Sequence, residues 1–380
     1  MKRNVFPLLM MLFLLNGVVF TTQNKAQGIP EGDENLVQAK VPSPSLSNNL
    51  IGVPSEQKVY ICLPPSYLER GKKYPVLYFL TGFGDEAAFY TNGMYQDLKM
   101  QGVLKDLTEK KAINEMIIVI ASGTNFLGGS FYVNSDVGGN WEDYIVNDLI
   151  GYIDKNFRTI PQAEARGIAG HSMGGFGALY IAFRHPELFS AVYALSPQIF
   201  DNNGLSNSQM FAQSFVSEKF LKCEKENSEL SREKAHERLL IYCDNTRDLD
   251  LLFTLAYGMA FAPDTKKNAP YIDFPYSKAP VKANLNKELW NKWEDGIGGW
   301  DAKIKSLKEN ILKLKSIGIE YGLKDENKWI VDGCKYFIKV MNSEKIPLKS
   351  LSFAGGHQDN IKERIEKFMF PFFSAAFASK

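Results

Sequence analysis

The sequence predicts an α/β fold, a three-layer sandwich in which helices cover both faces of a mostly parallel sheet. Short, wholly apolar runs at 76–80 and 117–121 are typical of strands that are buried on both faces. Residues 141–157 repeat apolar side chains at helical spacing. Strand-like and helix-like segments also alternate along much of the chain, which is the pattern of a layered α/β sheet.

The other elements follow in the same alternating order. Residues 58–63 alternate in polarity and end at Pro64-Pro65, which indicates an edge strand. Short apolar runs that are flanked by glycine or followed by serine indicate strands, and longer amphipathic segments indicate helices. These criteria predict strands at 167–170, 191–196, 317–322 and 349–353, and helices at 174–184, at 329–342 and from about Asn360 onward.

The alternation breaks between residues 197 and 316. This stretch contains charged helical runs around 218–238 and an aromatic, proline-marked segment at 257–276. We therefore expect one α/β domain over 50–380, in which 197–316 form an insertion or lid above the carboxyl edge of the sheet. The insertion also carries Trp290, Trp293 and Trp300. They either contact an aromatic or sugar-bearing substrate or form a small core of their own.

The amino terminus resembles an export signal. Lys2 and Arg3 precede an apolar run at 5–20, and small and polar residues follow through Ala26. This layout predicts a signal peptide at 1–26 and a secreted or periplasmic protein. The run is short for a membrane span, which needs about 20 residues, so we expect no span after cleavage; the alternative is an uncleaved anchor. Residues 27–49 are polar and proline-marked, which indicates a linker or N-terminal arm.

Composition argues against several classes of protein. The 380 residues carry a net charge of +1, so no overall field attracts nucleic acid or anionic lipid. The sequence lacks a zinc-binding H-E-x-x-H motif, a G-x-G-x-x-G turn after a strand and a phosphate-binding loop, so neither a metal nor a nucleotide cofactor is expected. The four cysteines lack zinc-ligand spacing. Export permits disulfides among them, but buried free thiols fit equally well.

The strongest local motif is Gly170-His171-Ser172-Met173-Gly174, which fits the G-x-S-x-G pattern of a nucleophile elbow. Such an elbow raises a serine hydroxyl on a tight strand-to-helix turn, and small residues on either side let neighbouring backbone pass close by. The helix that follows directs its positive end at the site. Ser172 is therefore the candidate nucleophile.

A serine nucleophile needs a base, and the chain offers four histidines. His171 lies inside the elbow and is aimed differently from Ser172, His185 lies at a helix end, and His236 lies in a charged helical run. His357 follows Gly355-Gly356 just beyond the last predicted strand. Loops at the carboxyl ends of strands are where α/β enzymes place working groups, so His357 is the candidate base.

The base in turn needs a carboxylate that orients its ring, and in this fold class the acid lies between serine and histidine in the chain. Asp325 follows the predicted strand 317–322, and one helix and one strand separate it from His357. It is the candidate acid. The adjacent Glu326 is the alternative, whereas Asp332 falls on the predicted helix.

An oxyanion hole requires two backbone N–H groups. One is expected from Met173, directly after the nucleophile, and the other from the loop 81–84 after an earlier strand, with Phe83 as the donor. The alternative for this loop is an ordinary glycine turn. The segments 129–132 and 139–141 either line the mouth of the pocket or shape a loop.

These residues resemble a known family. Residues from about 45 to 373 are similar to the family of α/β-hydrolases that includes esterase D (S-formylglutathione hydrolase), feruloyl esterase modules and bacterial mycolyltransferases. The similarity rests on six short stretches in the family's order and spacing. They are VYICLPPSY at 59–67, YPVLY at 74–78, NWEDY at 140–144, RGIAGHSMGG at 166–175, HPELF at 185–189 and GGH at 355–357.

The resemblance implies ester hydrolysis or acyl transfer by a Ser-Asp-His triad without a cofactor. By position, it places the nucleophile at Ser172, the base at His357 and the acid at Asp325 or Glu326. One residue departs from the pattern: many relatives have a histidine before the glycine of the oxyanion loop, where this chain has Thr81. The long insertion also differs from compact members, so the substrate class does not carry over.

The sequence thus predicts an exported serine esterase that acts on small-molecule or carbohydrate esters. Acyl groups on sugars or polysaccharides suit the compartment. The first alternative is an acyltransferase, in which an alcohol or sugar acceptor replaces water in the second half-reaction. The second is a non-catalytic glycan-binding protein that keeps the fold.

Overall fold

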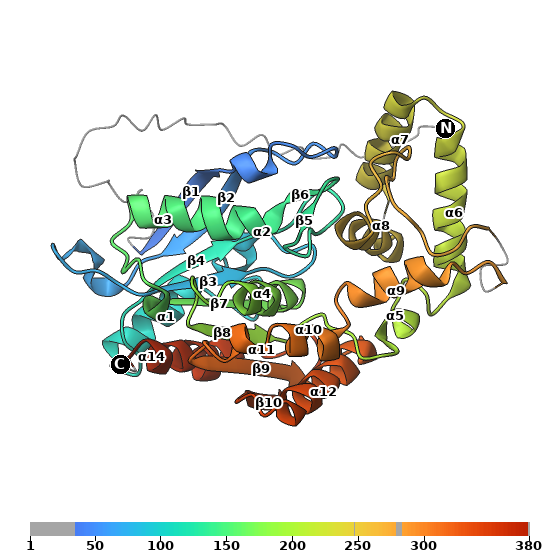
Figure 1. Ribbon diagram of the computed structural model, residues 1–380. Helices are drawn as coiled ribbons and strands as arrows, with labels where there is room; N and C mark the ends of the chain where they lie inside the picture. The colour runs from blue at the N-terminus through green and yellow to red at the C-terminus, as the bar shows by residue number, and fades with distance from the viewer. Residues whose placement is uncertain (1–34, 247, 279–282, 379–380) are drawn as a thin grey trace, which may run out of the picture.

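The computed structural model describes residues 35–246, 248–278 and 283–378 of the chain. The predicted signal peptide at 1–26 lies outside these residues, as does the first part of the predicted arm. Nearly all helices and strands of the described chain belong to one layered body, and a group of helices projects to its side (Figure 1).

An eight-stranded sheet forms the middle layer, with the strand order β1-β2-β4-β3-β7-β8-β9-β10. β2 pairs antiparallel with both β1 and β4, and the remaining neighbours are parallel. The strands are β1 (Leu36–Pro42), β2 (Glu56–Cys62), β3 (Val76–Leu80), β4 (Ile117–Ala121), β7 (Arg166–His171), β8 (Ala191–Leu195), β9 (Ser316–Gly322) and β10 (Lys349–Phe353). The short β5 (Asn134–Ser135) and β6 (Gly139–Asn140) form a separate two-stranded sheet.

Two hydrophobic cores lie on opposite faces of the large sheet, and β3 contributes to both. Val76, Tyr78 and Leu80 join one core, whereas Leu77 and Phe79 join the other, and all five side chains are fully buried. This alternation follows from the two-residue period of a strand. It explains why a strand buried on both faces has a continuous apolar sequence.

Helices cover both faces, so the predicted α/β sandwich is confirmed (Figure 1). α1 (Met100–Glu109), α13 (Ile361–Arg364) and α14 (Phe370–Ala378) pack on one face. The other face carries α2 (Trp141–Asp143), α3 (Ile150–Asn156), α4 (Met173–Arg184), α10 (Trp300–Ser306), α11 (Lys308–Ile311) and α12 (Lys328–Ser343). π-helical turns at Tyr144–Leu149 and Ile365–Met369 connect α2 to α3 and α13 to α14.

The prediction of a linker or irregular arm is wrong for part of 27–49, because Leu36–Pro42 form the edge strand β1. Residues 58–63 were expected at the edge, but β2 pairs with β1 on one side and with β4 on the other. The sequence carried a signal for β1, because polar Gln38 and Lys40 alternate with apolar residues such as Val41. In the structure, Gln38 and Lys40 are exposed, whereas Val41 is fully buried. Nearby prolines, which usually mark loops, hid this alternation.

The break in the alternation corresponds to a group of helices between the parallel neighbours β8 and β9. It contains α5 (Gly204–Asn207), α6 (Ser214–Ser228), α7 (Arg232–Asn245), α8 (Leu249–Phe261) and α9 (Lys287–Asp295). Figure 1 shows α6 to α9 gathered beyond one end of the sheet. By contrast, α10 and α11 pack against α12 and α4 and belong to the helical layer. The projecting part is therefore shorter than the predicted 197–316.

The three tryptophans of this region separate into two environments. Trp293 is fully buried and Trp290 is partly buried within the projecting helices. Trp300 instead lies over the sheet, with its ring 5.0 Å from that of Phe337 and 6.3 Å from that of Phe183. The first two therefore serve the core of the insertion, in a cluster that comprises Phe211, Phe274, Tyr276, Trp290 and Trp293.

Among the described residues, the helices are each too short or too polar to cross a bilayer.

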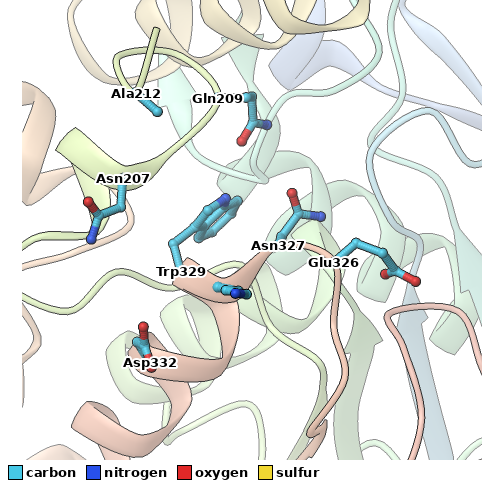
Figure 2. A pocket seen from close by; sticks show the side chains of 8 residues that line it. Asn207, Gln209, Ala212, Glu326, Asn327, Trp329 and Asp332 are labelled. Carbon is cyan, nitrogen blue, oxygen red and sulfur yellow. The ribbon is translucent and has the colours of Figure 1, made fainter.

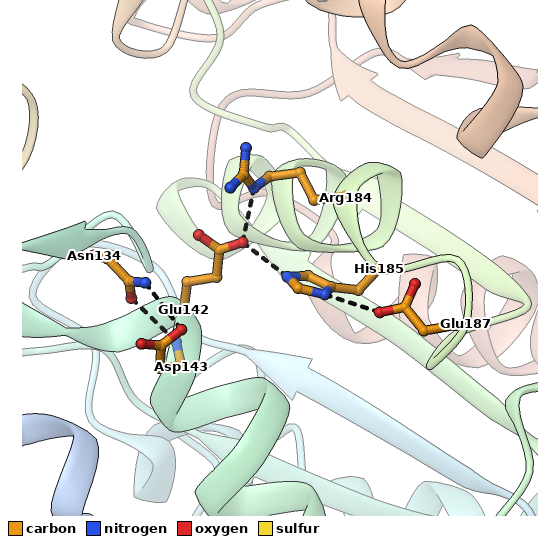
Figure 3. A network of polar contacts seen from close by, with 6 residues as sticks. All are labelled: Asn134, Glu142, Asp143, Arg184, His185 and Glu187. Atoms are coloured by element: carbon orange, nitrogen blue, oxygen red, sulfur yellow. Dashed lines mark hydrogen bonds and ion pairs between the residues drawn. The ribbon is translucent and has the colours of Figure 1, made fainter.

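A buried carboxylate ties α2 to the end of α4 (Figure 3). Glu142 accepts hydrogen bonds from Arg184 Nε at 2.7 Å and from His185 Nε2 at 2.8 Å. His185 Nδ1 lies 3.1 Å from a carboxylate oxygen of Glu187. Carboxylates only accept, so both contacts are satisfied when His185 is the doubly protonated cation. Hydrogen bonding to Glu142, against the opposing effect of burial, raises the pKa of His185.

Because of this network, we expect the contribution of His185 to the free energy of unfolding to depend on pH. Burial favours the neutral form of Glu142, but the hydrogen bonds from His185 and Arg184 outweigh it and lower its pKa. The carboxylate therefore stabilises the fold above its unfolded pKa of about 4.3, and the imidazolium does so below about 6.5. We expect His185→Gln to lose about 1 kcal/mol of unfolding free energy at pH 5.5, and progressively less as the pH rises through the raised pKa of His185 in the folded protein, where wild type loses the charge too.

Urea unfolding of wild type and variant at pH 5.5 and at several higher pH values measures this loss. His236→Gln is the matched control, because His236 lies on α7, away from this network, where its ring contacts Tyr271. A loss that is equal at all of these pH values would contradict the charged role of His185.

Candidate active site

Ser172 occupies the sharp turn between β7 and α4. Its backbone has φ 59° and ψ −120°, a conformation that costs a non-glycine residue about 1–3 kcal/mol. The flanking glycines permit the turn, because a Cβ at Gly174 would lie 2.0 Å from the carbonyl oxygen of Leu80. A Cβ at Gly170 would lie 2.2 Å from the carbonyl oxygen of Gly174. The G-x-S-x-G spacing thus follows from backbone contacts that leave no room for a side chain.

The three residues predicted to work together lie in hydrogen-bonding contact. The Oγ atom of Ser172 is 2.8 Å from Nε2 of His357. Nδ1 of the same imidazole is 2.6 Å from Oδ2 of Asp325. The carboxylate only accepts, so Nδ1 carries the proton and Nε2 faces the hydroxyl as an acceptor. This is the tautomer that a general base requires.

Parallel strands bring these distant residues together. Ser172 follows β7, Asp325 follows β9 and His357 follows β10, so all three lie beyond the carboxyl ends of strands in one half of the sheet. The side chain of Asp325 is fully buried, and its Oδ1 accepts the backbone N–H of Asn327 at 2.9 Å. The side chain of His357 retains 13% exposure. A buried, hydrogen-bonded carboxylate thus holds the ring of a histidine that remains partly exposed.

Glu326 contacts a different part of the base. Its Oε2 accepts the backbone N–H of His357 at 3.1 Å, whereas the ring nitrogens of His357 bond to Asp325 and Ser172. Of the two acids that the sequence left open, Asp325 therefore has the geometry of an orienting carboxylate. Glu326 instead holds the main chain of the histidine loop.

The loop after β3 lies directly against the nucleophile. A Cβ at Gly82 would lie 3.3 Å from Cβ of Ser172. Phe83 and Met173 also lie together, because a Cβ at Gly129 would touch both side chains. Within the described residues, no acceptor is hydrogen-bonded to the backbone N–H of Phe83 or Met173. Two unpaired donors beside a serine are the components that an oxyanion hole requires.

Thr81, the residue that departs from the family pattern, supports this loop with its own side chain. Its Oγ1 donates to the carbonyl oxygen of Asp85 at 2.9 Å. From the other side, the hydroxyl of Tyr132 donates to the carbonyl oxygen of Thr81 at 3.0 Å and accepts the N–H of Gly123 at 2.9 Å. The segment 129–132 thus contributes a buried side chain, Tyr132, that supports the loop 81–84.

The other histidines lie in different surroundings. His185 belongs to the network at the end of α4, and His236 contacts Tyr271 on the insertion. His171 is 1% exposed, and burial together with the nearby His357 lowers its pKa to about 4. Asp85 is not among the residues predicted from the sequence, yet its buried carboxylate accepts the N–H of Gly82 at 3.2 Å. The sequence signal that could have identified Asp85 is its position, directly after the strand 76–80 and the glycine-containing turn 81–84.

A cleft of about 450 Å³ opens beside the loop that carries Asp325 and Glu326, between α5 and the start of α12 (Figure 2). Trp329 is only 4% exposed, and its indole Nε1 has no hydrogen-bond partner among the described residues. Oε1 of Gln209 is likewise buried and unpartnered there. Six of the eight residues that line it are polar or charged, and the lining consists of Asn207, Gln209, Ala212, Glu326, Asn327, Lys328, Trp329 and Asp332.

The cleft is connected to the candidate catalytic residues by short contacts. Glu326 in its wall bonds to the main chain of His357. The ring of Trp329 lies 5.0 Å from that of Phe200. Two residues before Phe200, the N–H of Gln198 donates to the carbonyl oxygen of Ser172 at 3.0 Å. The cleft therefore lies on the side of the site that carries the acid and the base.

Sequence comparisons point to one family. A model of the family described as "Putative esterase" matches residues 52–294. Two proteins of Mycobacterium tuberculosis, Esterase Rv1288 of strain H37Rv and Esterase MT1326 of strain CDC 1551, are each 39% identical to this chain over 134 residues. The match covers 35% of this chain and spans only 27% of the length of those relatives.

Solved structures share the fold at low identity. A ferulic acid esterase aligns with a TM-score of 0.57 and 19% identity over 90% of this chain and 98% of its own. FphF, a fluorophosphonate-binding serine hydrolase of Staphylococcus aureus, aligns with a TM-score of 0.54 and 15% identity, over 89% of this chain and 98% of its own. Together with the family match, which extends over more than half of the residues, these comparisons show that the chain belongs to this esterase family of α/β-hydrolases.

Proposed function

We propose that this protein is an exported serine esterase that hydrolyses carboxylic esters through Ser172, His357 and Asp325. The observation that carries the proposal is the continuous contact from serine hydroxyl to imidazole to buried carboxylate, at 2.8 and 2.6 Å. A serine is a weak nucleophile by itself, and a base in such contact activates it. Membership of the esterase family supports the same chemistry.

The first half-reaction forms an acyl-enzyme. His357 Nε2 takes the proton of Ser172 as its Oγ attacks the ester carbonyl carbon. The carbonyl oxygen gains negative charge, which the N–H groups of Phe83 and Met173 stabilise together with the positive end of α4. His357, now a cation held by Asp325, donates its proton to the leaving alkoxide. The C–O bond breaks and the alcohol departs.

The second half-reaction releases the acid. His357 takes a proton from water, the resulting hydroxide attacks the acyl carbon, and the same two N–H groups stabilise the second oxyanion. The bond to Ser172 then breaks, and Oγ recovers its proton from His357.

The leaving alcohol of our proposal is a hydroxyl of a sugar or polysaccharide. The leaving oxygen must face His357, because Nε2 protonates it, and the cleft in Figure 2 lies on this side. Amides such as Asn207 and Asn327 both donate and accept, which suits hydroxyls that do the same. The unpartnered Nε1 of Trp329 supplies one further donor among the described residues. Export, which rests on the pattern of residues 1–26, would bring the enzyme to extracellular glycans.

The experiment that tests this function compares acetylated sugars, feruloyl esters and simple alkyl esters of short and long acyl chains. Fluorophosphonate labelling, followed by mass spectrometry of the modified peptide, reports the nucleophile. We expect labelling at Ser172 and higher kcat/KM for the sugar esters than for alkyl esters of the same acid. Folded protein that hydrolyses none of the esters and is not labelled would favour the non-catalytic glycan-binding alternative.

An added sugar acceptor separates hydrolysis from acyl transfer. Hydrolysis releases free acid whether or not the acceptor is present, whereas transfer yields a new ester. Because both reactions share the acyl-enzyme, the product ratio is the decisive measurement. New ester as the main product in dilute acceptor would replace the esterase with an acyltransferase.

A further inference from the structure

A chain of buried polar side chains lies beneath the site, and its first member is Asp85. Oδ2 of Asp85 accepts the backbone N–H of Gly82 at 3.2 Å and lies 2.8 Å from the hydroxyl of Tyr90. Oδ1 accepts the hydroxyl of Tyr95 at 2.5 Å. Asp85 is 7% exposed, and Tyr90 is fully buried. A buried carboxylate therefore fixes the glycine of the oxyanion loop.

The same chain continues to the main chain of the base. The hydroxyl of Tyr90 lies 3.2 Å from Nδ1 of His171, and Nε2 of His171 lies 3.1 Å from the carbonyl oxygen of His357. The rings of His171 and His357 also lie together, with centroids 5.0 Å apart. His171 directly precedes the nucleophile, so this residue is linked to the nucleophile, to the base and, through Tyr90 and Asp85, to the oxyanion loop.

The hydrogen-bond pattern fixes the tautomer of His171. A carbonyl oxygen only accepts, so Nε2 carries the proton and donates it to His357. Burial lowers the pKa of His171 to about 4, so the ring is neutral near pH 7 and Nδ1 is an acceptor. The single hydroxyl proton of Tyr90 then lies between two acceptors, the carboxylate of Asp85 and the imidazole of His171.

We propose that His171 is a positioning residue for the reaction, and that Asp85, Tyr90 and His171 hold the oxyanion loop and the histidine loop at a fixed separation. This inference rests on the proposed function of Ser172 and His357. Asp325 orients the ring of His357, whereas His171 fixes the carbonyl of its main chain. Loss of that contact lets the loop shift, and a displacement of about 1 Å at the reacting atoms typically costs about 100-fold in rate.

Three variants test the proposal with p-nitrophenyl acetate as the substrate. We expect His171→Leu to lower kcat by about 10- to 100-fold with little change in KM, because the loss concerns alignment in the transition state. His171→Gln, whose amide can still donate to the carbonyl of His357, should recover most of this loss. Tyr90→Phe should lower kcat about threefold alone and have no further effect in His171→Leu, because the link is already broken.

Controls separate positioning from folding and from the proposed function itself. Thermal unfolding of each variant shows whether it folds, and His236→Gln, on the insertion, should match wild type in kcat. If His171→Leu retains wild-type kcat, or if the glutamine variant is as slow as the leucine variant at equal stability, the inference is wrong. Ser172→Ala is measured in parallel: activity that survives in this variant overturns the proposed function instead.

Discussion

Ser172→Ala is expected to lower kcat for ester hydrolysis by about 10⁶-fold, the scale seen when a serine hydrolase loses its nucleophile. Alanine keeps the Cβ atom, so the strained turn between β7 and α4 retains its shape while the Oγ atom that lies 2.8 Å from His357 is lost. The remaining donors can still polarise a bound carbonyl, which leaves a weak residual activity above the rate in water.

Steady-state kinetics on the best ester of the panel, with fluorophosphonate labelling of the same samples, measures this loss. Ser206→Ala, an exposed serine on α5, is the matched control and should retain wild-type rates. Circular dichroism verifies that both variants fold. Turnover in Ser172→Ala within tenfold of wild type would move the chemistry to another residue.

Asp325→Asn is expected to lower kcat by about 10⁴-fold, because an amide in place of the carboxylate favours the wrong tautomer of the base. When the new amide donates to Nδ1 of His357, the ring proton moves to Nε2, which then cannot accept the proton of Ser172. The change keeps the size of a fully buried side chain, so the fold should persist. Loss of charge beside the imidazolium adds to the effect. Steady-state kinetics on the same ester measures the loss.

Glu326→Gln is the matched control for this prediction. Glutamine keeps an oxygen that can accept the backbone N–H of His357, and the ring of His357 retains its bond to Asp325. We therefore expect a loss of less than about tenfold in kcat, far below that of Asp325→Asn. The reverse order of the two variants would make Glu326 the acid and would show that the loop rearranges when substrate binds.

Local sequence patterns predicted the central strands of the sheet. They also predicted Ser172, His357 and Asp325, the three residues that lie in hydrogen-bonding contact. The runs at 76–80 and 117–121 became β3 and β4 with the expected bounds, because a strand buried on both faces is apolar at every position. Ser172 was found because a tight turn leaves a fixed glycine spacing. His357 and Asp325, which the structure brings into contact with each other and with Ser172, were predicted because working groups gather after strands in this fold class.

Features that depend on contacts between distant residues were missed. β1 is an edge strand that has only one neighbour among the described strands, so its short alternation was weak beside the surrounding prolines. The link from Asp85 through Tyr90 to His171 joins residues without any regular spacing, and only the fold brings them together. Trp300 was assigned to the insertion because sequence order alone does not show that α10 returns to the sheet.

The position of the projecting helices has an evolutionary consequence. They follow β8 and precede β9, so in chain order they lie between the candidate nucleophile Ser172 and the candidate acid Asp325. Neither of the attachment points carries a residue of the proposed triad. Within the segment, α8 packs on the proposed oxyanion loop, because the ring of Phe253 lies 5.0 Å from that of Phe83. Substitutions in the other projecting helices can therefore accumulate with less effect on the proposed chemistry, which would let descendants of one ancestor acquire new substrates while they keep the same hydrolytic residues.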